Sequence, residues 1–480
     1  MPERDRLDAH GLMPVAWYSP TMRFNRRRLF AALAGVASVS AATSAPARET
    51  EVSPARDAGQ SSRIDAATLG LLPHSADDQS KTFQRAIDRA AAAGAVLDIA
   101  AGVYRAGGLV LPPHAAIAGV AGATRIMLAT QHSLFAAGGS DHIGLTGLIL
   151  DGANIPLAER QGLVDLARGR AVRIADCEIV NVGGNGIALA AIEGEVTGNT
   201  ISAADAAIFS LDAAGLKISG NQVRGAGNNG ILVWRSTPGD DGTLVVDNRI
   251  ENVTNKSGGS GQYGNAINVF RADNVIVRGN RIGNAAFSAV RGNAASNLQI
   301  TGNTCTALGE VALYAEFGFE GALIANNIVD GAAIGVAVTN FNRGGRLAVV
   351  QGNLVRNLLP RRPAGTDPND DAGIGIGVEA DTLVTGNVIE NAPHTGIAAG
   401  WGQYLRDVAI TGNIVRSANY GITVSVAPGA GASLIADNLI SGARLGAIVG
   451  MERKKPVTGD LTRDGAGRYA QLTINGNRVQ

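Results

Sequence analysis

One phrase, apolar-x-apolar-x-Gly-Asn-x-apolar, recurs from residue 195 to the C-terminus and constrains the fold more than any other feature. It reads EVTGNTI at residues 195–201 and LTINGNRV at residues 472–479. Its asparagine stands at positions 199, 221, 248, 280, 303, 327, 353, 387, 413, 438 and 477. Successive asparagines are 22 to 39 residues apart, as in a solenoid whose shortest coil is lengthened by irregular loops. An earlier, degenerate copy carries Cys177 at the asparagine position.

A second strand pattern, usually led by glycine, lies between these phrases, as in NGILVW at residues 229–234 and YGITVS at residues 420–425. Each coil therefore holds at least two short strands in which inward apolar residues alternate with outward ones. The main alternative fold is a leucine-rich repeat, whose repeated phrase is similar. The return segment of that repeat is helical or carries extended leucines, whereas the return segment here is a second strand led by glycine. The pattern favours an all-β fold, a right-handed parallel β-helix with coils of 22 residues or more.

The repeated asparagine has a structural explanation. A corner between two strands needs a left-handed backbone conformation, which asparagine tolerates better than most residues. Stacked in register, the side-chain amides can also bond to their neighbours in a ladder. We therefore expect these asparagines to occupy the left-handed corner and to form an asparagine ladder.

Residues 63–128 are expected to form an N-terminal helical cap and the first coils, and residues 129–480 the repeat domain. Acidic residues precede an apolar stripe at helical spacing, and short strands follow. The segment resembles the N-terminal cap of the pectate-lyase-like superfamily. The residues that match are Asp77, Asp78, Phe83, Ala86, Ile87 and Ala90, followed by Ala100-Ala101-Gly102-Val103-Tyr104. The resemblance implies a helix that covers the open end of a solenoid.

The N-terminal segment is typical of an export signal. Residues 25–47 hold a basic cluster, a short apolar stretch and Ala45-Pro46-Ala47. The stretch Arg26-Arg27-Arg28-Leu29-Phe30 resembles the twin-arginine motif, with an ordinary Sec signal as the alternative. We expect a signal peptide at 1–47, a linker at 48–62, a start at Met22 rather than Met1, and a periplasmic or secreted protein. The whole chain resembles a family of twin-arginine-exported β-helix repeat proteins without an assigned activity.

Charge and cysteine content limit the partners. Residues 1–47 hold six of the 41 basic and three of the 41 acidic residues, which leaves 35 and 38, a net charge of −3. Such a chain has no general electrostatic attraction to nucleic acid or to an anionic membrane. Cys177 and Cys305 lie about five coils apart, too far for a disulfide, and are expected to be buried free thiols. No cofactor or metal site is expected.

Aligning the second strand by coil predicts a polar and aromatic stripe on one outward face. With Ile231 inward, the outward columns are led by position 232 and by position 234. The candidate catalytic residues are Arg291, Tyr314, Glu316 and Glu379. The candidate substrate-binding residues are Trp234, Arg235, Asn268, Arg271, Asn340 and Trp401. Insertions at 235–243, 252–264, 356–371 and 451–470 would wall a groove if they rise on one side.

Aromatic rings stack on sugars and arginine binds carboxylates in pairs, so the stripe suits an acidic polysaccharide. A lyase could use Arg291 to neutralise a uronate and Tyr314 to carry the proton. A hydrolase could use Glu316 and Glu379, about two coils apart. The alternative is a non-catalytic glycan-binding or structural protein of the cell envelope.

Known catalytic signatures are mostly missing. No histidine in the repeats follows glycine, as polygalacturonase-like hydrolases require, and no aspartate cluster at coil spacing suggests the calcium site of pectate lyases. Residues 367–370, DPND, are similar to the D-P-H-D motif of mannuronan C5-epimerases, with asparagine in place of histidine. A uronan C5-epimerase is therefore the lower alternative.

Overall fold

The computed structural model describes residues 62–340, 346–367 and 370–480. The predicted signal peptide (1–47), and all but the last residue of the predicted linker (48–62), lie outside the described residues, as does the middle of the DPND motif. Residues Ser61–Gln480 form one compact unit. In the part of the chain described, no helix is both long and apolar enough to span a bilayer.

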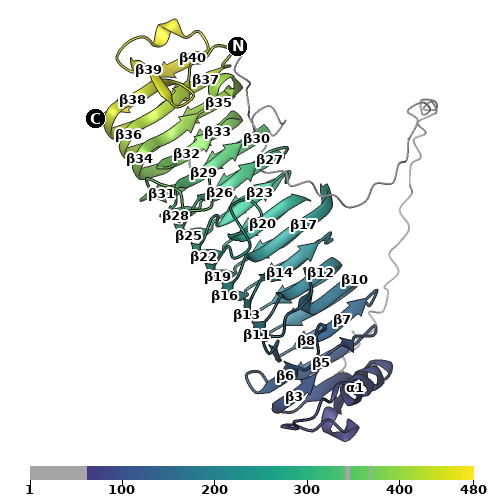
Figure 1. Cartoon of the computed structure of the whole chain (residues 1–480). Coiled ribbons are helices and arrows are strands. Elements are labelled where there is room, and N and C mark those ends of the chain that lie inside the picture. The colour runs from purple at the N-terminus through teal and green to yellow at the C-terminus, as the bar shows by residue number, and fades with distance from the viewer. Residues whose placement is uncertain (1–61, 341–345, 368–369) are drawn as a thin grey trace, which may run out of the picture. The chain divides into compact units, whose positions relative to one another are not determined.

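Most coils contribute three parallel strands or strand segments, and each pairs with its equivalent in the next coil. For example, three successive strands, β15 (Lys217–Ser219), β16 (Gln222–Ala226) and β17 (Asn229–Asp240), pair in turn with β18 (Leu244–Val246), β19 (Arg249–Val253) and β20 (Asn265–Asp273). Figure 1 shows the strands stacked along one long solenoid. The prediction of a parallel β-solenoid is confirmed, and the third strand per coil fits the expected minimum of two.

The first stack of strands precedes the asparagine corner. It consists of β1 (Arg63–Asp65), β2 (Val96–Ile99), β5 (Ala116–Gly119), β8 (Gly144–Thr146), β15 (Lys217–Ser219), β18 (Leu244–Val246), β21 (Ile276–Arg278), β24 (Leu298–Thr301), β27 (Glu320–Ala325), β30 (Arg346–Gln351), β33 (Ala380–Thr385), β35 (Arg406–Thr411), β37 (Ser433–Ala436) and β40 (Leu472–Asn475).

The second stack follows that corner. It consists of β3 (Gly102–Ala106), β6 (Thr124–Leu128), β9 (Ile149–Asp151), β11 (Glu178–Val182), β13 (Thr200–Ala203), β16 (Gln222–Ala226), β19 (Arg249–Val253), β22 (Arg281–Ala285), β25 (Thr304–Leu308), β28 (Ile328–Asp330), β31 (Leu354–Arg356) and β41 (Arg478–Val479).

The third stack consists of β4 (Leu109–Val110), β7 (Phe135–Gly138), β14 (Ala206–Leu211), β17 (Asn229–Asp240), β20 (Asn265–Asp273), β23 (Val290–Asn293), β26 (Val311–Glu316), β29 (Ile334–Thr339) and β32 (Ile374–Val378). Long strands join two stacks: β10 (Gly162–Ala175), β12 (Asn185–Thr197), β34 (Val388–Ala399), β36 (Ile414–Ser425) and β38 (Leu439–Glu452).

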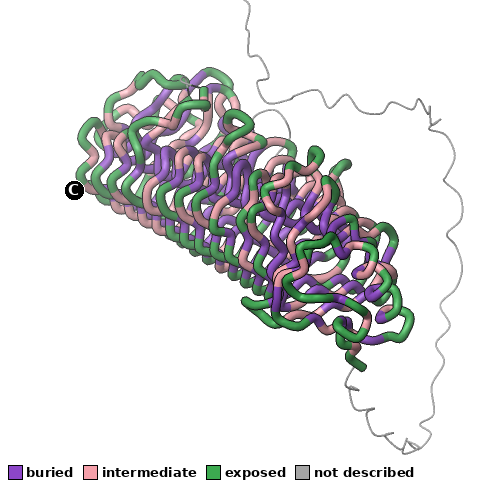
Figure 2. The backbone as a smooth tube through the Cα atoms, turned by 60° about the horizontal axis from the view of Figure 1, so that its bottom comes forward, coloured by how far each residue is buried: buried purple, intermediate pink, exposed green. Residues whose placement is uncertain are grey.

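The core fills the inside of the coils. Inward residues such as Ile231, Ile267 and Val290 are fully buried and stack on one another from coil to coil. Figure 2 shows buried segments running through the interior of the solenoid, with exposed residues at its rims and loops. The alternation of inward and outward residues read from the sequence is therefore the pattern that the structure uses.

The asparagine ladder is continuous from Asn199 to Asn477. In each rung the backbone N–H and the side-chain Nδ2 donate to Oδ1 of the next asparagine, as from Asn303 to Asn327 at 2.9 and 3.0 Å. The ladder prediction is confirmed. Cys177 takes the place of a first rung, because its N–H donates to Oδ1 of Asn199 at 2.9 Å. Both cysteines are buried free thiols, as expected.

The predicted backbone role of the ladder asparagines is wrong. The left-handed residue is the one before the asparagine, for example Gly302 with φ +65° and Gly412 with φ +64°. Where that residue is not glycine it is Asp247, Asn326 or Asp437, each also at positive φ. Glycine therefore makes the corner, with short polar side chains as substitutes, and the asparagine fills it.

Two elements lie at the ends of the solenoid. Helix α1 (Ser80–Ala92) buries Phe83, Ala86, Ile87 and Ala90 on the side that faces β2, β4 and β5, at the N-terminal end in Figure 1. At the other end β39 (Lys455–Asp460) pairs antiparallel with β38, and the buried Leu461 joins the core. Part of segment 451–470 thus folds onto the last coils. Single 3₁₀ turns are η1 (Ala66–Leu69), η2 (Gly402–Tyr404) and η3 (Ala466–Arg468).

Candidate functional site

The predicted stripe lies on the outward side of β14, β17, β20, β23 and β26, which we call the middle face. Its first column runs through Leu232, Asn268, Arg291 and Tyr314 in continuous register. Its second column runs through Trp234, Phe270, Asn293, Glu316 and Thr339. Both columns agree with the alignment made from the sequence, so coil spacing alone located this face.

Arg291 and Glu316 form a bidentate ion pair across two coils. The Arg291 Nε and Nη2 donate to the two carboxylate oxygens of Glu316 at 2.7 and 2.9 Å. Asn293 Nδ2 donates to Glu316 Oε1 at 2.7 Å. Only 1% of the Glu316 side chain and 12% of the Arg291 side chain are exposed. Burial alone would lower the pKa of Arg291, but Glu316, Tyr314 and Glu310 together raise it, so the guanidinium stays charged.

Two charged residues that the sequence analysis missed complete this cluster. Glu310 Oε2 lies 3.6 Å from Arg291 Nη1, and Glu310 Oε1 accepts a hydrogen bond from Arg362 Nη1 at 2.8 Å. Arg362 belongs to the 356–371 insertion and also contacts Asp370 at 3.1 Å. Arg291 Nη1 and Glu310 Oε2 are buried without a hydrogen-bond partner among the described residues. An arginine in a long insertion has no periodic signal, which is why this contact could not be predicted.

Tyr314 lies beside the ion pair rather than in open solvent. The Arg291 guanidinium carbon sits 5.0 Å from the centre of the Tyr314 ring, and the phenol bonds to the Thr339 side chain. Burial, with Glu316 second, raises the pKa of Tyr314 far above its ordinary value. The phenol therefore keeps its proton at physiological pH and is a weaker acid than a free tyrosine.

The other end of the middle face is aromatic. The rings of Phe209 and Phe270 meet Trp234 edge-on, with centroids 5.7 and 5.8 Å from the Trp234 ring. The Arg271 guanidinium lies 4.7 Å from the centre of the Phe270 ring. Trp234, Phe270 and Arg271 are partly exposed. Together these residues make a partly exposed aromatic platform edged by a cation.

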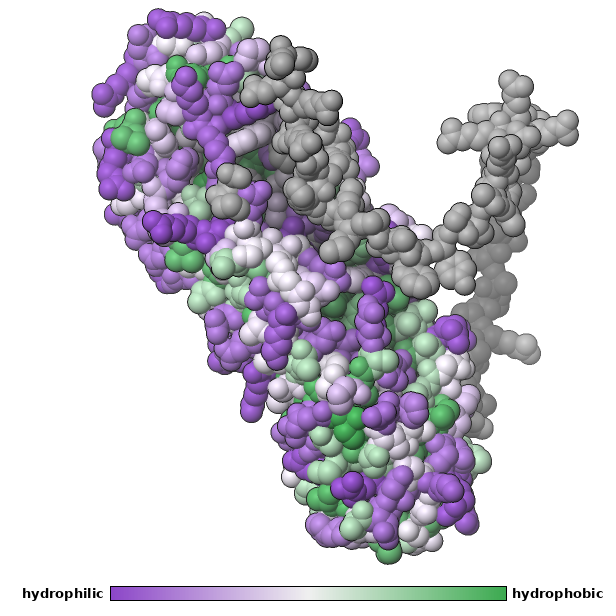
Figure 3. Space-filling model, viewed as in Figure 1, coloured by the Kyte–Doolittle hydropathy of each residue, from purple (hydrophilic) through white to green (hydrophobic). Residues whose placement is uncertain are grey.

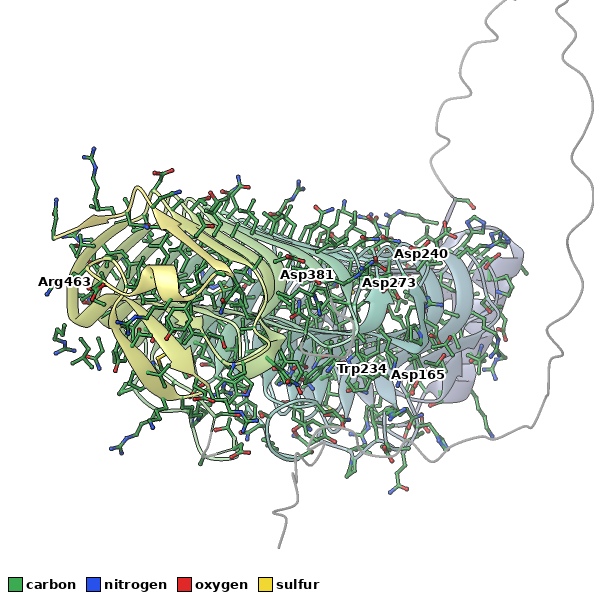
Figure 4. All side chains as sticks on the ribbon, turned by 90° about the horizontal axis from the view of Figure 1, so that it is seen from above. Asp165, Trp234, Asp240, Asp273, Asp381 and Arg463 are labelled. Carbon is green, nitrogen blue, oxygen red and sulfur yellow. The ribbon has the colours of Figure 1, made fainter. Side chains whose placement is uncertain are left out.

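An acidic residue that the sequence analysis did not single out lies on the same sheet. Asp165 occupies the first column, three coils before Leu232. Figure 4 shows Asp165 and Trp234 on the same side of the solenoid, away from Asp240 and Asp273. Burial raises the pKa of Asp165, opposed by the Gly162 N–H, which donates to its carboxylate at 3.2 Å. Its coil precedes the first Gly-Asn phrase, so the repeat gave no register by which Asp165 could be aligned with the later coils.

The remaining predicted binding residues are placed differently. Asn268 and Asn340 are buried, and their amides donate to the backbone oxygens of Gly261 and Ala380. Arg235 bonds to the Ala213 carbonyl at 3.2 Å. The structure therefore brings Trp234 and Arg271 to the surface together but encloses the two asparagines.

Glu379 and Trp401, the last two predicted residues, lie beyond the ion-pair cluster. The Glu379 carboxylate accepts from the Asn340 N–H at 2.9 Å, at a strand end outside the paired register of β29 and β32. Trp401 is half-buried and precedes the turn η2. The structure does not join either residue to the Arg291–Glu316 pair.

Three of the four insertions are connected on one side of the middle face. Ser260 N–H donates to the Gly365 carbonyl at 3.2 Å, which ties insertion 252–264 to insertion 356–371. Lys454 contacts Asp371 at 2.9 Å and so ties insertion 356–371 to the antiparallel pair of β38 and β39 in insertion 451–470. The 235–243 segment continues β17 at the opposite end of the strand. Arg362 of this connected set covers the Arg291 cluster through its hydrogen bond to Glu310.

A metal is not indicated at any of these positions, because the described residues contain no group of three or more His, Cys, Asp or Glu side chains arranged to bind an ion.

Figure 3 shows hydrophilic and hydrophobic residues interleaved over the visible surface rather than one strongly apolar band.

Replacing Glu310 by glutamine is expected to flatten the dependence of stability on pH. Burial raises the pKa of Glu310 above 4.5 although Arg291 and Arg362 oppose the shift, so the folded chain keeps a proton that the unfolded chain has lost. The unfolding free energy therefore falls as pH rises from about 4.5 towards the folded pKa, and Glu310→Gln lacks this fall. Urea midpoints of both proteins across this range measure the difference, and parallel curves would contradict it.

Comparisons with known proteins agree with the strand stacking. Residues 154–250 match the family described as "Right handed beta helix region". No curated protein matches the sequence. Together with the parallel stacks, the match defines the class: an all-β protein with a right-handed β-helix region.

Several solved structures resemble this chain at low sequence identity. The surface adhesin PfbA of Streptococcus pneumoniae is 12% identical over 87% of this chain and 90% of its own, with a TM-score of 0.45. The catalytic unit of an α-1,3-glucanase from Streptomyces thermodiastaticus is 15% identical over 88% and 70%, with a TM-score of 0.47. The A-module of a mannuronan C-5 epimerase from Azotobacter vinelandii is 15% identical over 87% and 99%, with a TM-score of 0.42.

Proposed function

We propose that this protein is an exported glycan-binding β-helix whose contact surface is the aromatic platform of the middle face. The observation that carries the proposal is the partly exposed pair of Trp234 and Phe270, with the buried Phe209 behind Trp234 and Arg271 over the Phe270 ring. Aromatic faces stack on sugar rings, and an adjacent arginine can bind a carboxylate of an acidic sugar. The proposed ligand is therefore a polysaccharide with acidic groups.

Export and end-capping are part of the same proposal. The twin-arginine signal at 1–47 would place the protein in the periplasm or outside the cell, as in the exported β-helix repeat family that the sequence resembles. Helix α1 would serve as the N-terminal cap, because its buried apolar side packs against the first strands.

The second candidate function is polysaccharide lysis or hydrolysis in the middle coils. The raised pKa of Glu310 favours it, because burial shifts this carboxyl in the direction that a general acid needs. The proposed roles of Arg291 and Tyr314 have less support, since Glu316 already neutralises the guanidinium. We therefore place binding before catalysis.

Binding to pectate, alginate, hyaluronan and a neutral glucan tests both candidates. Trp234→Ala is expected to weaken binding of an acidic glycan by about tenfold or more, because it removes the central ring of the platform. Trp401→Ala, which lies away from the platform, is the matched control. Equal affinity of the Trp234→Ala variant and the wild type would contradict the platform.

The same four glycans, incubated with the protein, distinguish binding from catalysis. Ultraviolet absorbance from unsaturated uronates would show a lyase, and new reducing ends without absorbance would show a hydrolase. Bound glycan that remains intact supports the binding function. The absence of both binding and turnover on every glycan would overturn the proposal.

A further inference from the structure

The outward face of the second stack changes character halfway along the solenoid. Its first column starts with polar residues, Glu178, Thr200, Gln222, Arg249, Arg281 and Thr304, in continuous register. From β28 to β38 the same column is aliphatic, with Ile328, Leu354, Val388, Ile414 and Leu439 in five successive coils, and Arg478 of β41 ends it. We call this aliphatic column and the charged column beside it the C-terminal face.

The aliphatic column is open rather than packed against another element. Ile328 is 40% exposed, and the other four residues are partly exposed. Four coil steps of ~4.8 Å make the column ~19 Å long. A contiguous aliphatic row on a surface is the kind of feature that protein interfaces use. They lack the aromatic rings that a sugar would stack on.

In the charged column beside the aliphatic one, positive and negative side chains alternate, so that the column is complementary to a second copy of itself that runs in the opposite direction. Two residues after the aliphatic column, the outward residues are Asp330, Arg356, Glu390 and Arg416. Their signs along the solenoid are therefore negative, positive, negative, positive. Within one chain Asp330 contacts Arg356 at 2.8 Å and Glu390 contacts Arg416 at 3.9 Å.

We propose that the C-terminal face is where a second copy of this chain docks, with the two solenoids antiparallel. A two-fold axis across the face, between the coils of Arg356 and Glu390, places each column opposite itself in reversed coil order. Asp330 then faces the partner's Arg416, and Arg356 faces the partner's Glu390. The aliphatic columns meet in the same way, and opposite charges flank the apolar contact.

The parallel alternative lacks this complementarity. In two copies with parallel axes, equivalent coils lie at the same level along the solenoid axis. The order of the charges is then the same in both copies, and opposite charges are not brought together by reversal. The antiparallel arrangement also fixes the register, because shifting it by one coil would bring Arg356 opposite the partner's Arg416. The charge order thus selects both the direction and the register of the docking.

Cysteine cross-linking tests the register directly. In the proposed dimer Ile328 faces the partner's Ile414, whereas the two lie three coils, or ~14 Å, apart within one chain, too far for an internal disulfide. The Ile328→Cys/Ile414→Cys variant is expected to give a covalent dimer on mild oxidation. Each single cysteine variant should stay monomeric on denaturing gels. Cys177 and Cys305 are buried and should not react.

A control pair has the same separation within one chain but the wrong partner. Leu354 and Leu439 also lie three coils apart, yet Leu354 faces the partner's Val388, about two coils from the partner's Leu439. The Leu354→Cys/Leu439→Cys variant should therefore cross-link poorly. Equal cross-linking of both double variants, or none in either, would overturn the proposal.

Molar mass in solution provides an independent measurement. The wild type should sediment as a concentration-dependent dimer, and Leu354→Lys should raise its dissociation constant by about tenfold or more, because it buries an unpaired charge. Leu383→Lys, at an exposed leucine on the neighbouring stack, should leave it unchanged. A wild type that is monomeric at every concentration, or a Leu354→Lys dimer of full affinity, would overturn the proposal.

A charge exchange distinguishes docking from loss of fold. Glu390→Lys should weaken the dimer, since it faces the partner's Arg356, and adding Arg356→Glu should restore it by reversing both signs. Failure of the second substitution to restore the dimer, with circular dichroism unchanged, would count against the proposed register.

Discussion

Glu316→Ala is expected to lower the free energy of unfolding by about 3–5 kcal/mol, one of the largest effects of any single substitution in this chain. The carboxylate accepts three hydrogen bonds, two from Arg291 and one from Asn293. Its removal leaves a guanidinium with a 12% exposed side chain, beside the Tyr314 ring and with Glu310 as the one remaining, more distant carboxylate among its ion-pair partners in the described residues. A buried charge that has lost its partner costs far more than the pair contributed.

Chemical denaturation measures this effect, with the fluorescence of Trp234 as a nearby reporter. Glu320→Ala is the matched control, because the Arg346–Glu320 pair has the same chemistry with side chains 53% and 61% exposed. The control should change stability by less than about 1 kcal/mol. Equal effects of the two substitutions would show that the Arg291 cluster is solvated.

The double variant Arg291→Met/Glu316→Leu separates the charge from the packing. Replacing a whole buried ion pair by apolar side chains of similar size is often neutral, so this variant should lose less stability than Glu316→Ala alone. A double variant that is less stable than the single one would instead mean that the pair organises its neighbours, Asn293 and Glu310.

The stacking and the register of the middle face could be predicted from the sequence, because both depend on coil period and strand alternation. Asn268, Arg291 and Tyr314 align in the structure as the spacing predicted. What surrounds them could not be predicted. Arg362 and Gly261 reach this face from insertions of 16 and 13 residues, 356–371 and 252–264, whose paths carry no period. Exposure was therefore overestimated for Asn268 and for Arg291.

The backbone conformation at the Gly-Asn corner shows a different limit of prediction from sequence. Both residues of the Gly-Asn phrase recur, and either could take positive φ from its chemistry alone. The sequence contained a hint, since the first position varies among glycine, aspartate and asparagine while the second stays asparagine in the ladder. Gly302, Asp247 and Asn326 share positive φ, which accounts for that variation. The invariant second position reflects hydrogen bonding inside the coil rather than backbone conformation.

Asn303→Ala is expected to destabilise the solenoid by about 3 kcal/mol or more, because it leaves several buried groups without partners. Oδ1 of Asn303 accepts from the N–H and Nδ2 of Asn280 at 2.9 and 3.0 Å, and its own Nδ2 donates to the Val277 carbonyl at 3.1 Å. Each polar group buried without a hydrogen bond costs about 1–3 kcal/mol. Urea denaturation followed by circular dichroism measures the loss.

Two matched substitutions separate hydrogen bonding from corner geometry. Gly302→Asn places at φ +65° a residue of the kind already found at Asn326, and should cost about 1 kcal/mol or less. Asn477→Ala removes the last rung, which is partly exposed, so water can replace its bonds to Asn438 and the loss should again be small. If Gly302→Asn proved as harmful as Asn303→Ala, the corner conformation rather than the buried ladder would dominate the stability of each coil.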